Sequence, residues 1–146
     1  PLMMAQVAGT IANGGDQMKP YLVAQTLDSD LNVVDTTTPK VARTPISSQT
    51  AQALSSLMQQ AVSDGTGSSA QVAGVSVAGK TGTAETGSDD GGPVTWFVGF
   101  AGTDLSKPSI ALAIVLDGGE QTAATGTGGS VAGPMAASII DAAVDQ

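Results

Sequence analysis

The residues of this sequence best suited to chemistry lie between Gly79 and Thr83, where it reads Gly-Lys-Thr-Gly-Thr. A strand here would place the hydroxyls of Thr81 and Thr83 on one face, because side chains alternate along a strand. Two hydroxyls next to the positive charge of Lys80 could hydrogen-bond a carboxylate. A glycine inside a strand, as at Gly82, often marks the close approach of a ligand backbone. Since an edge strand can accept an extended peptide as an added strand, we predict a site for a peptide ending in a free carboxylate.

The same residues also match a second motif. Residues 74–81 read Gly-Val-Ser-Val-Ala-Gly-Lys-Thr, which fits the pattern of a phosphate-binding P-loop. A P-loop follows a buried strand and opens a helix. Residues 63–71 are polar and glycine-rich, and the glycines after Thr81 do not favour a helix. A nucleotide hydrolase therefore stays an alternative function, and it predicts a helix that begins near Thr81.

Composition excludes several classes of site. The chain has 146 residues with neither Cys nor His, and 5 basic against 13 acidic residues give a net charge of −8. Without Cys there is no thiol nucleophile, disulfide or Cys-ligated zinc, and without His there is no Ser-His-Asp triad. We expect no metal and no cofactor. We also expect no nucleic-acid partner, because contacts to nucleic-acid phosphates are made mainly by Lys and Arg, which are few here. The longest apolar stretch, residues 110–116, is too short to span a bilayer, so we expect no membrane segment in this chain.

Hydrophobic periodicity predicts an α+β chain. It indicates helices at 2–13, 48–64 and 135–144, and a small hairpin around residues 27–34. We expect the apolar stripes of the first two helices to be core. Strands are expected at 75–85, 94–101 and 110–116, and their short connections favour an antiparallel meander. Residues 86–93 and 118–133 are expected to be loops.

Two of these strands carry a further prediction each. Trp96 and Phe97 are expected to anchor the core from the strand at 94–101. Residues 110–116 are apolar on both faces, which predicts a central strand with neighbours on both sides. Only residues 94–101 offer a convincing neighbour, so we expect a segment outside this chain to pair with the other edge.

Several segments together resemble a known family. Lys80-Thr81-Gly82 resembles the KTG motif of the penicillin-binding protein and serine β-lactamase superfamily. Residues 79–85 (Gly-Lys-Thr-Gly-Thr-Ala-Glu) and 96–101 (Trp-Phe-Val-Gly-Phe-Ala) resemble the third and fourth strands of class B penicillin-binding proteins. Segments at 13–21, 62–67 and 127–134 fit the same family in the same order. The resemblance covers nearly the whole chain.

The resemblance implies that residues 1–146 are the C-terminal portion of a transpeptidase domain. The implied fold is α+β, an antiparallel sheet flanked by helices, of which this chain supplies three strands. The family's Ser-x-x-Lys and Ser-x-Asn motifs are absent, since no Ser stands three residues before any of the four Lys or two residues before either of the two Asn. We therefore expect the nucleophile in an N-terminal part that this chain lacks, and this chain alone to be inactive.

The resemblance also implies roles for individual residues. Lys80 would assist proton transfer, Thr81 and Thr83 would hold the substrate carboxylate, and Gly82 would admit the substrate backbone. The backbone N–H of Thr83 would form part of the oxyanion hole. The implied enzyme is a peptidoglycan D,D-transpeptidase whose partners are the D-Ala-D-Ala stem peptide, β-lactams and the serine-bearing part of the same protein. It would work on the extracytoplasmic face of the bacterial cell membrane. A non-catalytic cell-wall scaffold of the same fold stays a further alternative.

Overall fold

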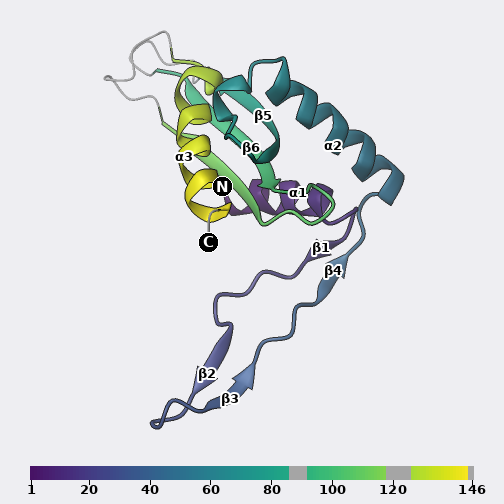
Figure 1. Ribbon diagram of the computed structural model, residues 1–146, viewed down its shortest axis with the longest axis vertical. Helices are drawn as coiled ribbons and strands as arrows, with labels where there is room; N and C mark the ends of the chain where they lie inside the picture. Colours follow the sequence, from purple (N-terminus) through teal and green to yellow (C-terminus); the bar gives the residue numbers. More distant parts are fainter. Residues whose placement is uncertain (86–91, 118–125, 145–146) are drawn as a thin grey trace.

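The computed structural model describes residues 1–85, 92–117 and 126–144 (Figure 1). In chain order, its elements are α1 (Leu2–Ala12), β1 (Gln17–Met18), β2 (Gln25–Leu27), β3 (Val33–Thr36), β4 (Val41–Arg43), α2 (Ser48–Ser63), the 3-10 turn η1 (Ser68–Ala70), β5 (Ser76–Ala84), β6 (Val94–Gly102), β7 (Ile110–Leu116), the π-helical turn η2 (Gly128–Ala132) and α3 (Gly133–Val144). The predicted helices and the three predicted long strands are all present, with bounds that shift by at most two residues.

The main sheet is the predicted antiparallel meander, in the order β5-β6-β7. Its register places Lys80 opposite Val98 and Thr83 opposite Thr95. Among the described residues β7 pairs with β6 alone, and the second neighbour that would make residues 110–116 a central strand is expected outside this chain. Helices cover both faces of β7, which explains why its two faces are both apolar without two neighbouring strands. A further strand from outside this chain stays a prediction.

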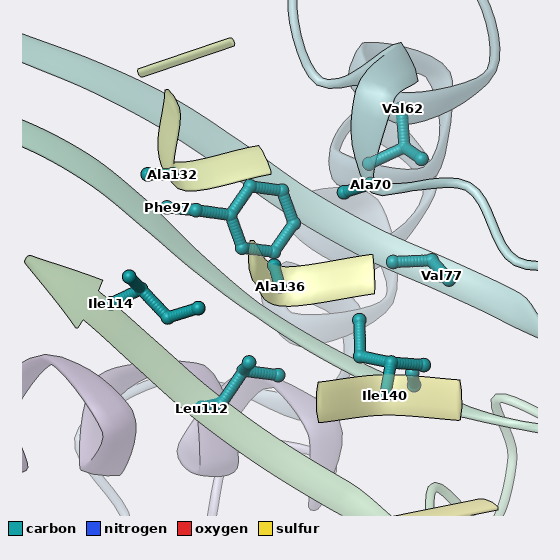
Figure 2. Close-up of a cluster of buried hydrophobic side chains, with 10 residues drawn as sticks. Val62, Ala70, Val77, Phe97, Leu112, Ile114, Ala132, Ala136 and Ile140 are labelled. Carbon is teal, nitrogen blue, oxygen red and sulfur yellow. The ribbon is translucent and has the colours of Figure 1, made fainter. Parts of the chain in front are cut away.

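Helices cover the two faces of this sheet and create two apolar clusters. On the α3 side, Phe97 and Ile140 are fully buried and pack with residues of η1, η2 and β7 (Figure 2). On the α1 side, Phe100 packs with Ala8 and Ala78. Helix α2 begins at an N-cap, Ser47, whose side chain accepts a hydrogen bond from the backbone N–H of Thr50, and it packs against β5. The two clusters hold β5 between them.

The apolar stripe of α1 is only partly core. Ala8 is buried as predicted, whereas Met3 is 76% exposed and Val7 is 42% exposed. The stripe of α2 behaves similarly, because Val62 is buried but Leu57 is exposed. The sequence prediction is wrong for these exposed positions, since the three-stranded sheet is too narrow to cover every apolar side chain of both helices. An uncovered apolar surface remains along α1.

The segment between α1 and α2 forms a long two-part arm. Strand β1 pairs with β4, and β2 pairs with β3 in the predicted hairpin. Figure 1 shows the arm extending away from the sheet and its helices. Its turn is fixed by Asp28, whose carboxylate accepts hydrogen bonds from the backbone N–H groups of Asp30 and Asn32.

The predicted loops at 86–93 and 118–133 lie partly outside the described residues. Within the second of them, η2 is helical, which the glycine-rich sequence did not predict. A reciprocal cap explains it: the Thr127 hydroxyl accepts from the Ser130 N–H, and the Ser130 hydroxyl accepts from the Thr127 N–H. The turn continues into α3, with Pro134 in the first turn of that helix as expected.

Candidate functional site

Strand β5 carries the candidate site on its second half. Its first half is fixed in the core, where Val77, Ala78 and Gly79 are buried. A Cβ atom on Gly79 would lie 2.2 Å from Cζ of the fully buried Phe97, so only glycine fits there. From Lys80 onward the strand emerges to the surface. The core thus holds the start of the strand rigidly and presents the next four residues.

The two threonine hydroxyls lie on the face of the sheet that α3 covers, as strand alternation requires. Thr81 is opposite Phe97 and Thr83 is opposite Thr95 in the register. The Oγ1 atoms of Thr81 and Thr66 are hydrogen-bonded at 2.7 Å. The Thr83 hydroxyl accepts a hydrogen bond from the backbone N–H of Gly128, at 3.0 Å. Both hydroxyls are therefore held in place by segments outside the sheet.

Lys80 and Gly82 face the opposite side of the sheet. The exposed Lys80 side chain folds over so that Nζ donates to the carbonyl oxygen of Thr81, 2.9 Å away. Because the backbone N–H and C=O of residues two apart in a strand point to the same edge, the Thr83 N–H faces the same edge as that carbonyl. Among the described residues, β5 pairs with a strand only along its β6 edge. An amine, two hydroxyls and a backbone N–H are thus gathered at one end of β5.

Gly82 is open where Gly79 is closed. A Cβ atom on Gly82 would meet only Cβ of Trp96, at 3.4 Å, which is ordinary van der Waals contact. The space in front of it belongs to a pocket of about 440 Å³, which β5 and β6 line with Lys80, Gly82, Trp96 and Val98. Side chains of α1 and Met58 of α2 form its other wall. Packing within the described residues does not require glycine at position 82.

Trp96 differs from its prediction. Phe97 is buried in the core as expected, but Trp96 is half-buried and lines the pocket beside Gly82. Adjacent strand residues point to opposite faces, so only one member of this pair reaches the α3 cluster. Trp96 is thus a candidate wall of the ligand site.

The face of β5 that lies away from this pocket is covered by η2. A Cβ atom on Gly128 would lie 2.5 Å from the carbonyl oxygens of both Gly82 and Trp96. A Cβ atom on Gly129 would lie 2.5 Å from the carbonyl oxygen of Thr66. The turn at Gly128 is therefore in direct backbone contact with β5, β6 and the segment after α2.

The P-loop alternative is wrong. Residues 76–84 form a single strand, and no helix begins near Thr81. A P-loop holds phosphate with the backbone N–H groups at the start of a helix, which these residues do not form. The described residues contain no cluster of three acidic side chains suited to a metal ion. Over the same residues, no helix is long and apolar enough to cross a membrane.

Sequence reasoning placed Lys80, Thr81, Gly82 and Thr83 on one strand, and the structure brings them together. It missed Thr66 and Gly128 as neighbours of the two hydroxyls. Both belong to segments, 62–67 and 127–134, that carried the family resemblance, but their contacts span 15 and 45 residues of chain. Contacts between residues so far apart in the sequence leave no local sequence pattern that could predict them.

Comparison with known proteins agrees with the resemblance. A family model described as the penicillin-binding protein transpeptidase domain matches residues 1–141. Peptidoglycan D,D-transpeptidase PbpA of Mycolicibacterium smegmatis is 42% identical over 149 residues, which cover all of this chain and 29% of that protein. Stage V sporulation protein D of Bacillus subtilis is 29% identical over 145 residues, covering 96% of this chain and 22% of that protein.

Solved structures agree as well. Penicillin-binding protein A from M. tuberculosis, as a ceftriaxone acyl-enzyme complex, has a TM-score of 0.81 and 37% identity. The match covers 95% of this chain and 31% of that one. The D,D-transpeptidase domain of a peptidoglycan glycosyltransferase from Eggerthella lenta has a TM-score of 0.77 and 33% identity, covering 97% of this chain and 32% of that one. The chain therefore spans less than a third of the length of these relatives. Sequence and fold together show that the chain belongs to the penicillin-binding protein transpeptidase family.

Proposed function

We propose that this chain is the C-terminal portion of a peptidoglycan D,D-transpeptidase and supplies the strand against which the substrate lies. The observation that carries the proposal is the contrast between the glycines of β5. Gly79 is required by the Phe97 ring, whereas Gly82 faces open space on the Lys80 side of β5. The Thr81 and Thr83 hydroxyls lie on the other face of the same end of the strand. An open glycine in a strand suits a ligand whose backbone comes close.

The proposed ligand is a stem peptide that ends in D-Ala-D-Ala. Its terminal carboxylate would accept hydrogen bonds from the hydroxyls of Thr81 and Thr83, next to the charge of Lys80. Its backbone would lie along β5 at Gly82. Penicillin-binding protein A from M. tuberculosis has been solved as a penicillin G acyl-enzyme complex, and by the same geometry we expect β-lactams to bind here.

The proposed reaction is acyl transfer through a serine that this chain does not contain. The serine oxygen attacks the carbonyl carbon of the penultimate D-Ala, and the oxyanion that forms is held by the Thr83 N–H and the serine's own N–H. The peptide bond to the last D-Ala then breaks, and D-Ala leaves with a proton on its amine. An amine of a neighbouring stem peptide next takes the acyl group from the serine. A donor in an oxyanion hole contributes about 3–4 kcal/mol of transition-state stabilisation.

Two features support a missing part that completes the site. The pocket beside Lys80 has an apolar wall formed by Met4, Val7 and Ile11 of α1. Met4 and Val7 are more than a third exposed in this chain alone. Lys80 Nζ donates a hydrogen bond to a backbone carbonyl of its own strand, and a serine that enters the pocket would give it a reacting partner. The proposed location is the extracytoplasmic face of the cell membrane.

The test is acylation of the full-length protein by fluorescent penicillin. Lys80→Ala should lower the acylation rate by about 10²–10⁴-fold, the usual contribution of a group that moves a proton in the transition state. Lys107→Ala is the matched control, because Lys107 lies in the turn between β6 and β7 and is exposed. A normal rate for Lys80→Ala would refute the role of Lys80. A full-length protein that penicillin does not label at all would favour the non-catalytic scaffold.

A further inference from the structure

The hydroxyls of Thr81 and Thr83 are each engaged by a hydrogen-bonding group from elsewhere in the chain. Thr66, in the segment just after α2, meets Thr81 with 2.7 Å between the Oγ1 atoms. The backbone N–H of Gly128, in η2, donates to Thr83 Oγ1 at 3.0 Å. Neither Thr66 nor Gly128 belongs to β5, and both approach from the face of the sheet that α3 covers.

The contact to Thr83 has a fixed direction. A backbone N–H can only donate, so it occupies a lone pair of the Thr83 hydroxyl and leaves the hydroxyl proton free. The contact between Thr66 and Thr81 joins two hydroxyls, and either could be the donor. A carboxylate placed against Thr81 accepts only, so it requires the Thr81 proton. The Thr66 proton must then point to the Thr81 oxygen.

From this geometry we propose that Thr66 is a positioning residue for carboxylate recognition. Its hydroxyl donates to Thr81, as the Gly128 N–H donates to Thr83, so both β5 hydroxyls are set to donate toward the ligand's carboxylate. This inference rests on the proposed function, which makes Thr81 and Thr83 the carboxylate-binding residues. Hydrogen bonds in a chain polarise one another, which strengthens the bond from Thr81 to the anion.

The packing around Thr66 leaves its backbone little freedom. Gly129 lies so close to the carbonyl of Thr66 that any side chain at 129 would collide with it. The Ser69 hydroxyl donates to the carbonyl of Gly129. Gly128 in turn lies directly on the backbone of Gly82 and Trp96. Thr66, Gly129 and β5 thus form one rigid contact that fixes the Thr66 hydroxyl before the ligand arrives.

A purely structural role of the Thr66 hydroxyl would have different effects on acylation. If the hydroxyl pair served only to attach the segment after α2 to β5, its loss would weaken every ligand equally and lower the stability. If it orients the Thr81 proton, the loss depends on whether the ligand carries a negative charge. Benzylpenicillin and its methyl ester differ only at the carboxylate, where the ester has no charge and carries an added methyl group, and they supply the discriminating pair of probes.

The experiment measures acylation rates of the full-length protein with both probes. Thr66→Val removes the hydroxyl at nearly constant volume, and it should slow acylation by benzylpenicillin about fivefold, the effect of one hydrogen bond. Acylation by the methyl ester should change by less than about twofold. Thr66→Ser should restore the rate with benzylpenicillin. Thr103→Val is the matched control, because Thr103 is exposed and follows the end of β6 that pairs with the start of β5, away from Thr81.

Thr81→Val separates this inference from the proposed function. Thr66→Val should add nothing to the loss caused by Thr81→Val, because the two residues act through one proton. Suppose that Thr81→Val slows acylation by benzylpenicillin. If Thr66→Val then leaves that rate unchanged, or slows acylation by both probes equally, the positioning role is refuted and the proposed function stands. If Thr81→Val leaves acylation unchanged, the carboxylate assignment itself is wrong. Should Thr66→Val lower the melting temperature markedly, Thr66→Ala gives a second measurement of the same ratio between the probes.

Discussion

Replacing the two glycines of β5 by alanine should have opposite effects on stability. At position 79 the new Cβ would lie 2.2, 2.9 and 3.0 Å from three atoms of the Phe97 ring. That ring is fully buried among η2, α3 and β7 and cannot move aside. Overpacking of this kind costs about 1–3 kcal/mol, and contacts this short place Gly79→Ala at about 3 kcal/mol.

At position 82 the same methyl group meets only Cβ of Trp96, at 3.4 Å. An alanine there restricts the unfolded chain, which stabilises the folded state by about 0.4–1 kcal/mol. The methyl would nevertheless occupy space that we assign to the ligand. Gly82→Ala should therefore slow acylation by penicillin about 10–100-fold, since a displacement of about 1 Å can cost a hundredfold in rate.

Thermal denaturation and acylation of the full-length protein check both halves of this prediction. Gly79→Ala should lower the melting temperature by about 6–12 °C, at about 2–4 °C per kcal/mol for a domain of this size class. Gly82→Ala should leave it unchanged or slightly raised. An equal loss of stability in both variants would refute the contrast between the two glycines. A stable Gly82→Ala protein that reacts at the normal rate would refute the assignment of Gly82 to the ligand.

Three further predictions follow from single contacts. Thr95→Val should stabilise the protein by about 1 kcal/mol in thermal denaturation, because the Thr95 side chain is buried and its hydroxyl has no partner among the described residues. Gly128→Ala should destabilise it by about 3 kcal/mol, since the new Cβ would collide with backbone atoms of two strands; an unchanged melting temperature would contradict the close packing of η2. The backbone N–H and then the side-chain amide of Asn32 hold the pKa of Asp28 below its ordinary value of 3.8. The stabilisation of the β2–β3 turn is therefore complete above about pH 3.8 and lost as the pH falls through the lower folded-state pKa. Asn32→Ala should raise the pKa of Asp28 toward 3.8, which an NMR titration of its carboxyl carbon measures.

Local sequence pattern was sufficient to predict the elements that carry the site. The polar, glycine-rich residues 63–71 and the glycines after Thr81 favoured a strand over a P-loop, and β5 is that strand. The apolar run of residues 110–116 predicted the bounds of β7. The central position of that strand in the complete sheet stays a prediction, because helices on both faces give the same two-sided apolar pattern as two neighbouring strands.

What the sequence did not predict depends on contacts between distant residues. Helix α1 has a helical apolar stripe, but its pattern could not reveal that Met3 and Val7 would be left uncovered by the narrow sheet. The contact of Thr66 with Thr81 and that of Gly128 with Thr83 exist only once α2, β5 and η2 pack together. The open face of Gly82 and the closed face of Gly79 likewise emerge from the register of β5 with β6.

The most direct test of the account is to locate the covalent bond that penicillin forms. The full-length protein is treated with benzylpenicillin, digested, and searched by mass spectrometry for the peptide that carries the adduct; the 146-residue chain is treated in parallel. We predict a single adduct on a serine outside residues 1–146, and no adduct on the 146-residue chain alone. An adduct on any side chain within residues 1–146 would contradict the claim that this chain supplies the substrate-binding strand and not the nucleophile.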